Sequence, residues 1–153
     1  MEARIEYWKV APGGYKALAG VEAYLAQCGL EVGLVHLLKL RASQMNGCAY
    51  CIDMHWKDLR ATGETEQRLY GLDAWRESPY YTARERAALG WIEALTDITD
   101  GHAPDDVYEE MRAHFSEKEA ADLTYAAAAI NAWNRLAIGM RSEAGRYEVK
   151  KGK

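Results

Sequence analysis

The sequence of 153 residues predicts an all-α protein. Apolar residues recur at spacings of three and four, which place side chains on one face of a helix. Two Ser/Thr-x-x-Glu motifs, Thr82 to Glu85 and Ser116 to Glu119, have the form of the capping box that begins a helix. No segment alternates apolar and polar residues over the length of a strand.

Size and composition bound the protein class. The length suits one domain, which we expect over residues 1–153 with its core at about 15–140. The net charge of −4 and the lack of a basic block argue against nucleic-acid binding. No apolar run approaches the roughly 18 residues of a membrane span, and the charged start at 1–6 is unlike a signal peptide. We therefore expect a cytoplasmic protein that binds neither nucleic acid nor membrane.

The first third of the chain reads as two helices. Residues 1–14 look irregular or extended and end in Ala11-Pro-Gly-Gly14, which reads as a break. A helix is predicted from about Tyr15 to Gln27, with Gly29 ending it. A second helix is predicted from about Glu31 to Met45.

A break at Asn46-Gly47 separates this second helix from a third, predicted from Cys48 to Thr62. On one continuous helix, His36 would lie about 18 Å along the axis from Cys48. A turn at the break would fold the second helix back, so that His36 could approach the thiols. A shorter helix at 64–71 and an aromatic loop at 73–81 follow.

Three helices make up the rest. Thr82 begins one that runs to about Thr96, and Pro104 precedes another from about Asp105 to His114. The longest, from about Glu117 to Met140, is rich in alanine and apolar nearly all round, which is typical of a buried helix or a subunit interface. The charged tail at 142–153 is expected to fray.

The candidate chemistry lies in Cys48-Ala-Tyr-Cys51-Ile-Asp-Met-His55. Helical spacing puts the two cysteine Cα atoms about 5 Å apart, within the range of an unstrained disulfide. The start of a helix favours a thiolate, which makes Cys48 the more acidic thiol on electrostatic grounds. His55, one turn after Cys51, could exchange a proton with it. The spacing suits reversible dithiol chemistry, while Cys28 is expected to pack as a small core residue.

A metal site is the alternative. His36, Cys48, Cys51 and His55 form a Cys₂His₂ set, which tetrahedral zinc accepts. The protein would then be a non-enzymatic dithiol or zinc-binding sensor or structural protein. Three of these ligands would lie on one short helix, which leaves little room to close a tetrahedron, so we favour redox chemistry.

Three segments together resemble the alkylhydroperoxidase D-like family, also called the carboxymuconolactone decarboxylase family. They are Arg41-Ala-Ser-Gln-Met-Asn-Gly-Cys-Ala-Tyr-Cys-Ile-Asp-Met-His55, the aromatic loop with Glu85-Arg-Ala-Ala-Leu89, and Ile130-Asn-Ala-Trp-Asn-Arg135. The resemblance covers about residues 15–140. It implies an all-helical fold, assembly as a homo-oligomer (trimer or hexamer) and oxidoreductase activity as a thiol peroxidase with no bound cofactor.

The resemblance also implies roles for the site residues. Cys51 attacks the peroxide and becomes a sulfenic acid, Cys48 resolves it to a disulfide, and His55 belongs to a proton relay. An external dithiol donor, such as a lipoyl or thioredoxin-like protein, restores the thiols. The intact Cys-x-x-Cys favours this chemistry over decarboxylation.

Two positions depart from the family peroxidases. Those place a glutamate twelve residues before the first cysteine, where this chain has His36, and a histidine before the second, where it has Tyr50. We expect His36 to accept the relay's proton, because imidazole is a base near neutral pH. Both departures leave disulfide cycling intact.

Two further groups are assigned structural roles. Trp75, Tyr80 and Tyr81 of the aromatic loop are expected to serve packing. The polar side chains of the last helix need partners if buried. We predict that Asn131, Asn134 and Arg135 form a network that holds this helix against the cysteine helix.

Overall fold

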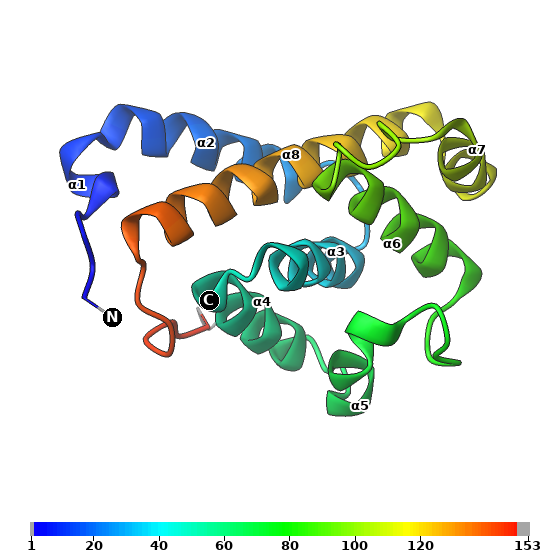
Figure 1. The fold of residues 1–153 in the computed structure, drawn as a ribbon, viewed down its shortest axis with the longest axis horizontal. Coiled ribbons are helices and arrows are strands. Elements are labelled where there is room, and N and C mark those ends of the chain that lie inside the picture. The colour runs from blue at the N-terminus through cyan, green and yellow to red at the C-terminus, as the bar shows by residue number, and fades with distance from the viewer. Residues whose placement is uncertain (1, 150–153) are drawn as a thin grey trace.

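The structure, a computed structural model that describes residues 2–149, is built of helices and contains no strand within that range (Figure 1). The predicted all-α class is confirmed. The elements are α1 (Tyr7–Val10), α2 (Pro12–Leu25), α3 (Val32–Asn46), α4 (Ala49–Ala61), α5 (Glu66–Tyr70), the 3₁₀ turn η1 (Leu72–Ala74), α6 (Ala83–Thr96), α7 (Asp105–His114) and α8 (Glu117–Met140).

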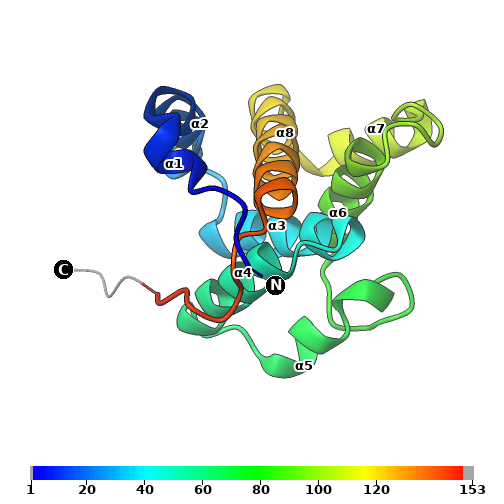
Figure 2. The same ribbon diagram turned by 60° about the vertical axis from the view of Figure 1, so that its left-hand side comes forward.

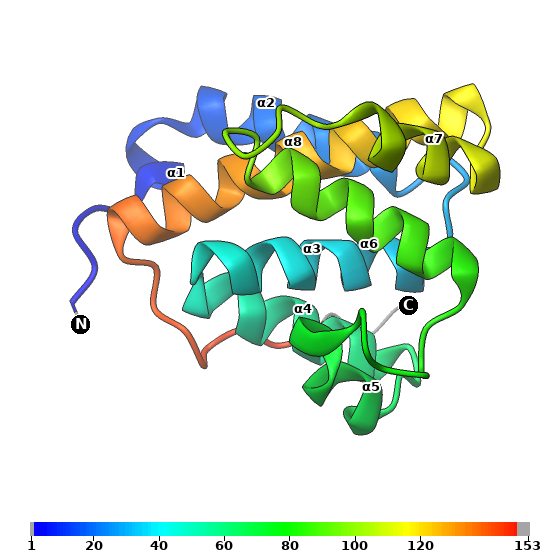
Figure 3. The same cartoon turned by 45° about the vertical axis from the view of Figure 1, so that its right-hand side comes forward.

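Helix α3 lies at the centre of the core. It packs against α4, α6 and α8, and leucine residues are buried on several sides of it. Figures 1 and 3 show α4 on one side of α3, with α8 and α2 running together on the other. Figure 2 shows α2, α8 and α7 fanning outward from the layer that α3 and α4 form. Any side chain on the α3–α4 face is therefore held by rigid elements.

Local sequence explains where the later helices begin. Both predicted capping boxes form: Thr82 and Ser116 each accept from the backbone N–H three residues on, and Glu85 and Glu119 bond back. Each box satisfies two N–H groups that the first turn leaves without intrahelical partners. Helices α6 and α8 therefore begin where the boxes predict, and α6, α7 and α8 all begin and end within a residue of their predicted bounds.

The N-terminal prediction was wrong. A short helix, α1, precedes α2, and α2 begins at Pro12 rather than Tyr15, so that Gly13 and Gly14 lie within its first turn. Proline suits this start because the first N–H of a helix has no partner to lose. Gly13 and Gly14 have low helix propensity, but they do not prevent the helix from forming directly after Pro12.

The tail beyond α8 does not fray over residues 142–149. It forms no helix, but its backbone and Tyr147 bond to α4. Lys57 donates to the carbonyl of Tyr147 (2.9 Å), and Asp53 accepts from the backbone N–H of Gly145 (3.1 Å). The expectation for residues 150–153 falls outside the described residues.

Helix α8 buries one side and exposes another. Ala126, Ala127 and Ile130 are buried, whereas Tyr125 and Ile138 are exposed in the single chain. The predicted burial therefore holds for part of the helix, and its role in a subunit interface stays a prediction. Across residues 2–149, no helix combines the length and apolarity needed to cross a membrane.

Candidate functional site

The turn between α3 and α4 places the two cysteines. Gly47 adopts a left-handed conformation (φ 68°) and ends α3, as the Asn46-Gly47 pair predicts. Asn46 donates to the Oδ1 atoms of Asn131 (3.0 Å) and Asn134 (2.8 Å), and Asn134 donates to Ser43 (3.0 Å). The predicted asparagine network forms, but it holds α8 against the end of α3 rather than against α4.

Cys48 and Cys51 form a disulfide with their Cα atoms 5.4 Å apart. Cys48 is the N-cap of α4, and its sulfur accepts from the N–H of Cys51 (3.3 Å). A sulfur in this position faces the positive end of the helix dipole, which favours its thiolate once the bond is reduced. Both cysteines are buried in the core.

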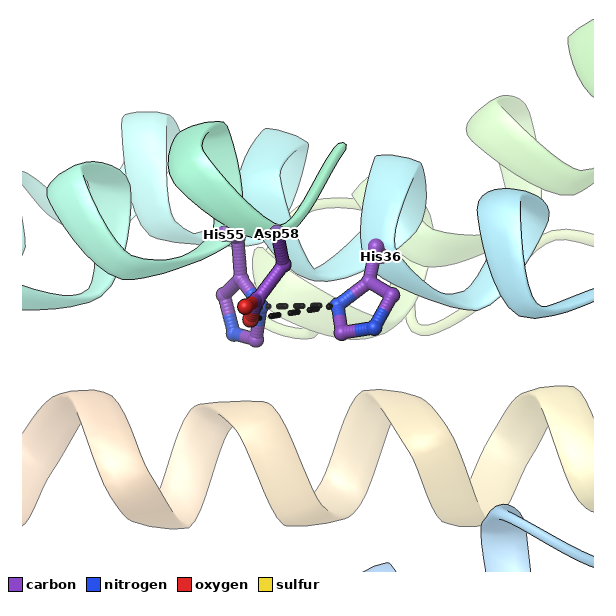
Figure 4. A group of neighbouring side chains, drawn as sticks. All are labelled: His36, His55 and Asp58. Atoms are coloured by element: carbon purple, nitrogen blue, oxygen red, sulfur yellow. Dashed lines mark hydrogen bonds and ion pairs between the residues drawn. The ribbon is translucent and has the colours of Figure 1, made fainter. Parts of the chain in front are cut away.

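His36 and His55 meet across the α3–α4 interface with Asp58 beside them (Figure 4). The two Nδ1 atoms are 3.3 Å apart. Oδ2 of Asp58 lies 3.7 Å from Nδ1 of His36 and 4.0 Å from Nδ1 of His55. Three polar groups thus converge on one point, and Nε2 of His55 is buried with no hydrogen-bond partner among residues 2–149.

The surroundings keep both imidazoles neutral. Burial, followed by the charge of Lys39 and the neighbouring His36, lowers the pKa of His55 well below its ordinary value. Burial also lowers the pKa of His36, although the carboxylate of Asp58 opposes it. Lys39 is itself buried and is paired with Glu22. Each neutral ring has one nitrogen that donates and one that accepts.

Two cavities reach the disulfide. One, of about 330 Å³, is walled by Cys51, the His36–His55–Asp58 group, Lys39 and Glu22. Its remaining walls are largely aromatic or apolar, from Tyr7, Tyr15, Ala19, Tyr50, Met54, Trp133 and Ala137. The other, of about 370 Å³, reaches Cys48 and Tyr50 from the side of the tail. Cys51 therefore shares a cavity with the histidines, whereas Cys48 lines a different one.

The structure brings together what the sequence singled out and adds residues that it missed. The turn places His36 beside His55, and both line a cavity with Cys51. Asp58 was missed, although its position three residues after His55 is a signal that helical spacing offers. Trp75 and Tyr81 are buried in the core, which agrees with a packing role.

The convergent group differs from the predicted zinc set. Among residues 2–149, the cluster of three or more potential metal-binding side chains is His36, His55 and Asp58. Cys48 and Cys51 are bonded to each other instead. Any ion held here would therefore have two nitrogen ligands and one oxygen ligand.

Comparison with known proteins places this site in a family. Residues 12–94, which run from the start of α2 into α6, match the carboxymuconolactone decarboxylase family. The chain belongs to this family. The resemblance seen in the sequence is thereby confirmed, and the matched segment contains Cys48, Cys51 and all three residues of the convergent group.

Two other proteins are similar to this chain over nearly its whole length. YdfG of Bacillus subtilis, an uncharacterized protein, is 43% identical over 94% of this chain and 98% of its own length. ATU0492 of Agrobacterium tumefaciens, a protein of unknown function linked with AhpD and antioxidant defence, is 49% identical with a TM-score of 0.92. The match covers 95% of this chain and 100% of that one.

A third comparison bears on the fold alone. The AhpD core of a peroxidase-related protein from Ralstonia eutropha has a TM-score of 0.80 at 20% identity. It covers 91% of this chain and 74% of the other. The carboxymuconolactone decarboxylase family fold is therefore shared with a more distant protein of the AhpD kind.

Proposed function

We propose that this protein is a thiol-dependent peroxidase that reduces organic hydroperoxides at Cys51. The observation that carries the proposal is the shared cavity. A cysteine able to form a disulfide lies in one cavity with a buried, neutral histidine whose Nε2 has no partner. A nucleophilic thiol needs such a base within reach, and family membership supports the peroxidase class.

The proposed chemistry balances without a bound cofactor. His55 takes the thiol proton of Cys51, and the sulfur attacks the terminal peroxide oxygen. The O–O bond breaks, the proton leaves with the alcohol product, and Cys51 becomes a sulfenic acid. The sulfur of Cys48 then displaces the hydroxyl as water and closes the disulfide. The two thiols supply both electrons that the peroxide takes up.

The histidine pair supports the proton transfer. In the tautomer with hydrogen on Nδ1, His55 faces His36 with its donor and leaves Nε2 as an acceptor. Asp58, on α4, supplies a carboxylate beside the two imidazoles. The family peroxidases instead have a glutamate at the position that His36 occupies on α3. In this proposal the negative charge of the relay has moved from one helix to the next.

The cavity wall supports an organic substrate rather than hydrogen peroxide. Tyr7, Tyr15, Tyr50 and Trp133 present ring surfaces beside Cys51. Apolar groups gain free energy by leaving water for such walls, at roughly 25 cal/mol per Å². A hydroperoxide with an aromatic or branched alkyl group would therefore bind more tightly than H₂O₂, which has no apolar surface to bury against these walls.

Regeneration requires an external dithiol donor. Cys48, at the helix start, is the better leaving thiolate, so we propose that the donor attacks the sulfur of Cys51. A lipoyl or thioredoxin-like protein has the required pair of thiols. The proposed assembly is a homo-oligomer.

The test follows thiols on metal-free, reduced protein that carries Cys28→Ser. One equivalent of cumene hydroperoxide is added, and the reaction is quenched with an alkylating agent for mass spectrometry. Rapid loss of two thiols as the Cys48–Cys51 disulfide is expected, with a slower reaction for H₂O₂. Cys48→Ser should stop at the sulfenic acid and Cys51→Ser should not react.

Controls separate the base from the fold. His55→Gln should slow the first step by about a hundredfold, which is the lower range for loss of a general base. Asp105→Asn, at the exposed start of α7, should react like the parent. Thiols that stay free in the parent protein, or a sulfenic acid formed on Cys48 instead, would refute the proposal.

A further inference from the structure

We propose that His36, His55 and Asp58 bind one divalent transition-metal cation, with zinc as the best fit, and that the bound ion switches the dithiol site off. Binding is independent of the proposed peroxidase activity. Only the inhibitory effect rests on that proposed function.

The geometry already has the size of a metal site. Nδ1 of His36, Nδ1 of His55 and Oδ2 of Asp58 form a triangle with edges of 3.3, 3.7 and 4.0 Å. The circle through its corners has a radius of about 2.1 Å, which is the length of a zinc–nitrogen or zinc–oxygen bond. One ion can therefore reach all three atoms with little movement of the side chains.

The ligand types select the class of metal. Imidazole nitrogens suit zinc and its neighbours in the first transition row, whereas calcium and magnesium require oxygen ligands. Two histidines and one carboxylate leave a coordination position open, as in sites that also hold water. All three ligands line the cavity shared with Cys51.

The charge and protonation of the site suit a cation. Asp58 supplies the negative charge, and the positive charge of Lys39 is offset by Glu22. A neutral imidazole has one nitrogen with a free lone pair, so Nδ1 can bind a cation when the ring hydrogen lies on Nε2. Once Lys39 and Glu22 neutralise each other, the negative charge of Asp58 remains beside the three ligand atoms, and it favours a cation.

The tail supports the carboxylate ligand. Tyr147 donates a 2.7 Å hydrogen bond to Oδ1 of Asp58, while Oδ2 faces the histidines. Metal-binding carboxylates are commonly held through their second oxygen in this way. The hydroxyl of Tyr147 thus holds the Asp58 carboxylate in the orientation that points Oδ2 toward the two imidazoles.

Metal binding would change the proton on His55. An ion on Nδ1 leaves the ring hydrogen on Nε2, the buried nitrogen without a partner. Nε2 then donates and cannot accept the proton of Cys51. The cation and the substrate thiol thus compete for the same imidazole, and the metal-bound protein should not react with peroxide.

The binding test uses the full chain, stripped with EDTA and kept reduced without oxygen so that the thiols are free to compete, with Co²⁺ and Zn²⁺ as probes. One ion per chain is expected by titration, and the Co²⁺ spectrum should show visible bands without a thiolate charge-transfer band. The Cys48→Ser/Cys51→Ser double variant should bind equally well. Asp58→Asn and His36→Gln should each weaken binding by at least about tenfold, while the control Asp105→Asn, at the exposed start of α7, should not.

Other outcomes would overturn the inference. No stoichiometric binding refutes it, as does binding that Asp58→Asn and His36→Gln leave unchanged. A charge-transfer band that the double cysteine variant loses would assign the metal to Cys48 and Cys51 instead.

The inhibitory effect has its own test: equimolar Zn²⁺ should stop disulfide formation in reduced protein, and EDTA should restore it. Undiminished turnover by zinc-loaded protein would refute the switch, while a chain inactive without metal would refute only the peroxidase.

Discussion

The hydroxyl of Tyr147 donates a hydrogen bond of 2.7 Å to Oδ1 of Asp58, across 89 residues of sequence. The tail beyond α8 thereby reaches the carboxylate that faces His36 and His55. The same contact raises the pKa of Tyr147, since burial and the Asp58 carboxylate both disfavour the phenolate. The C-terminal segment is therefore part of the candidate site, although nothing in its composition indicates this.

Tyr147→Phe should release the tail from α4. A hydrogen bond to a charged acceptor contributes about 1.5–3 kcal/mol, so local opening should become at least about tenfold more frequent. Limited trypsin digestion measures this, because Arg146 lies beside the contact. Cleavage after Arg146 should accelerate about tenfold while the thermal midpoint of the whole protein changes little.

Tyr70→Phe is the matched control. Tyr70 also donates to a carboxylate, that of Glu66, but on the exposed surface of α5. Its removal should leave the tail as resistant as in the parent. Equal cleavage rates at Arg146 for the parent and Tyr147→Phe would show that the hydroxyl does not hold the tail.

Asn134→Ala should destabilise the whole fold. Asn134 is fully buried and links Asn46 and Ser43 of α3 to α8. Its loss removes one hydrogen bond from each of these two partners and opens a cavity, at a combined cost of about 2–4 kcal/mol. Denaturant unfolding should show this loss, and the exposed neighbour variant Arg135→Ala should stay within about 0.5 kcal/mol of the parent. A midpoint unchanged by Asn134→Ala would contradict a structural role for the network.

Local signals account for what could be predicted from the sequence. The capping boxes at Thr82 and Ser116 and the break at Gly47 act within a few residues, so the helix bounds near them were predictable. Pro12 illustrates the opposite case. The pattern Ala11-Pro-Gly-Gly14 is compatible with a break and with a helix start, and only the packing of α2 on α8 decides between them.

The site could be predicted in part for the same reason. Cys48, Cys51 and His55 lie on one helix, whose spacing fixes their relation. The approach of His36 needed the angle between α3 and α4, which the turn permits but does not dictate. Asp58 lies on the same helix as His55, but it belongs to the site because it also lies beside His36 of α3. Tyr147 lies in a tail whose sequence has no periodic pattern. Long-range contacts of this kind leave no mark in local spacing.

Glu93→Gln should lower stability in a pH-dependent way. Burial acts to raise the pKa of Glu93, but hydrogen bonds from Trp75, Arg41 and Arg76 outweigh it, and the net pKa is lowered. A lowered pKa means that the stabilisation is present above the unfolded pKa of about 4.3 and is lost as pH falls further. At pH 7 the variant should lose about 2–4 kcal/mol, because Arg41 keeps its charge without its partner.

Urea unfolding from pH 7 to pH 3 tests the sign of this effect. The gap between the parent and Glu93→Gln should narrow below about pH 4, where the Glu93 carboxylate of the unfolded parent takes up a proton while that of the folded parent still resists it. Glu77→Gln, on the exposed part of the preceding loop, should match the parent throughout. A gap that stays constant down to pH 3 would mean that the ion pairs of Glu93 do not contribute.

Gly47→Ala should lower the unfolding free energy by about 1–2 kcal/mol, because an L-residue resists the left-handed backbone at this position (φ 68°). No atom lies within 4 Å of an added Cβ, so the cost comes from the backbone alone. Gly47→Asn should recover part of it, since asparagine tolerates this conformation. Gly20→Ala is the control. It also adds a methyl group in open space, but within α2, where it should stabilise by about 0.5–1 kcal/mol. If Gly47→Ala were as stable as Gly20→Ala, the left-handed turn that sets Cys48 at the start of α4 would not be needed for the fold.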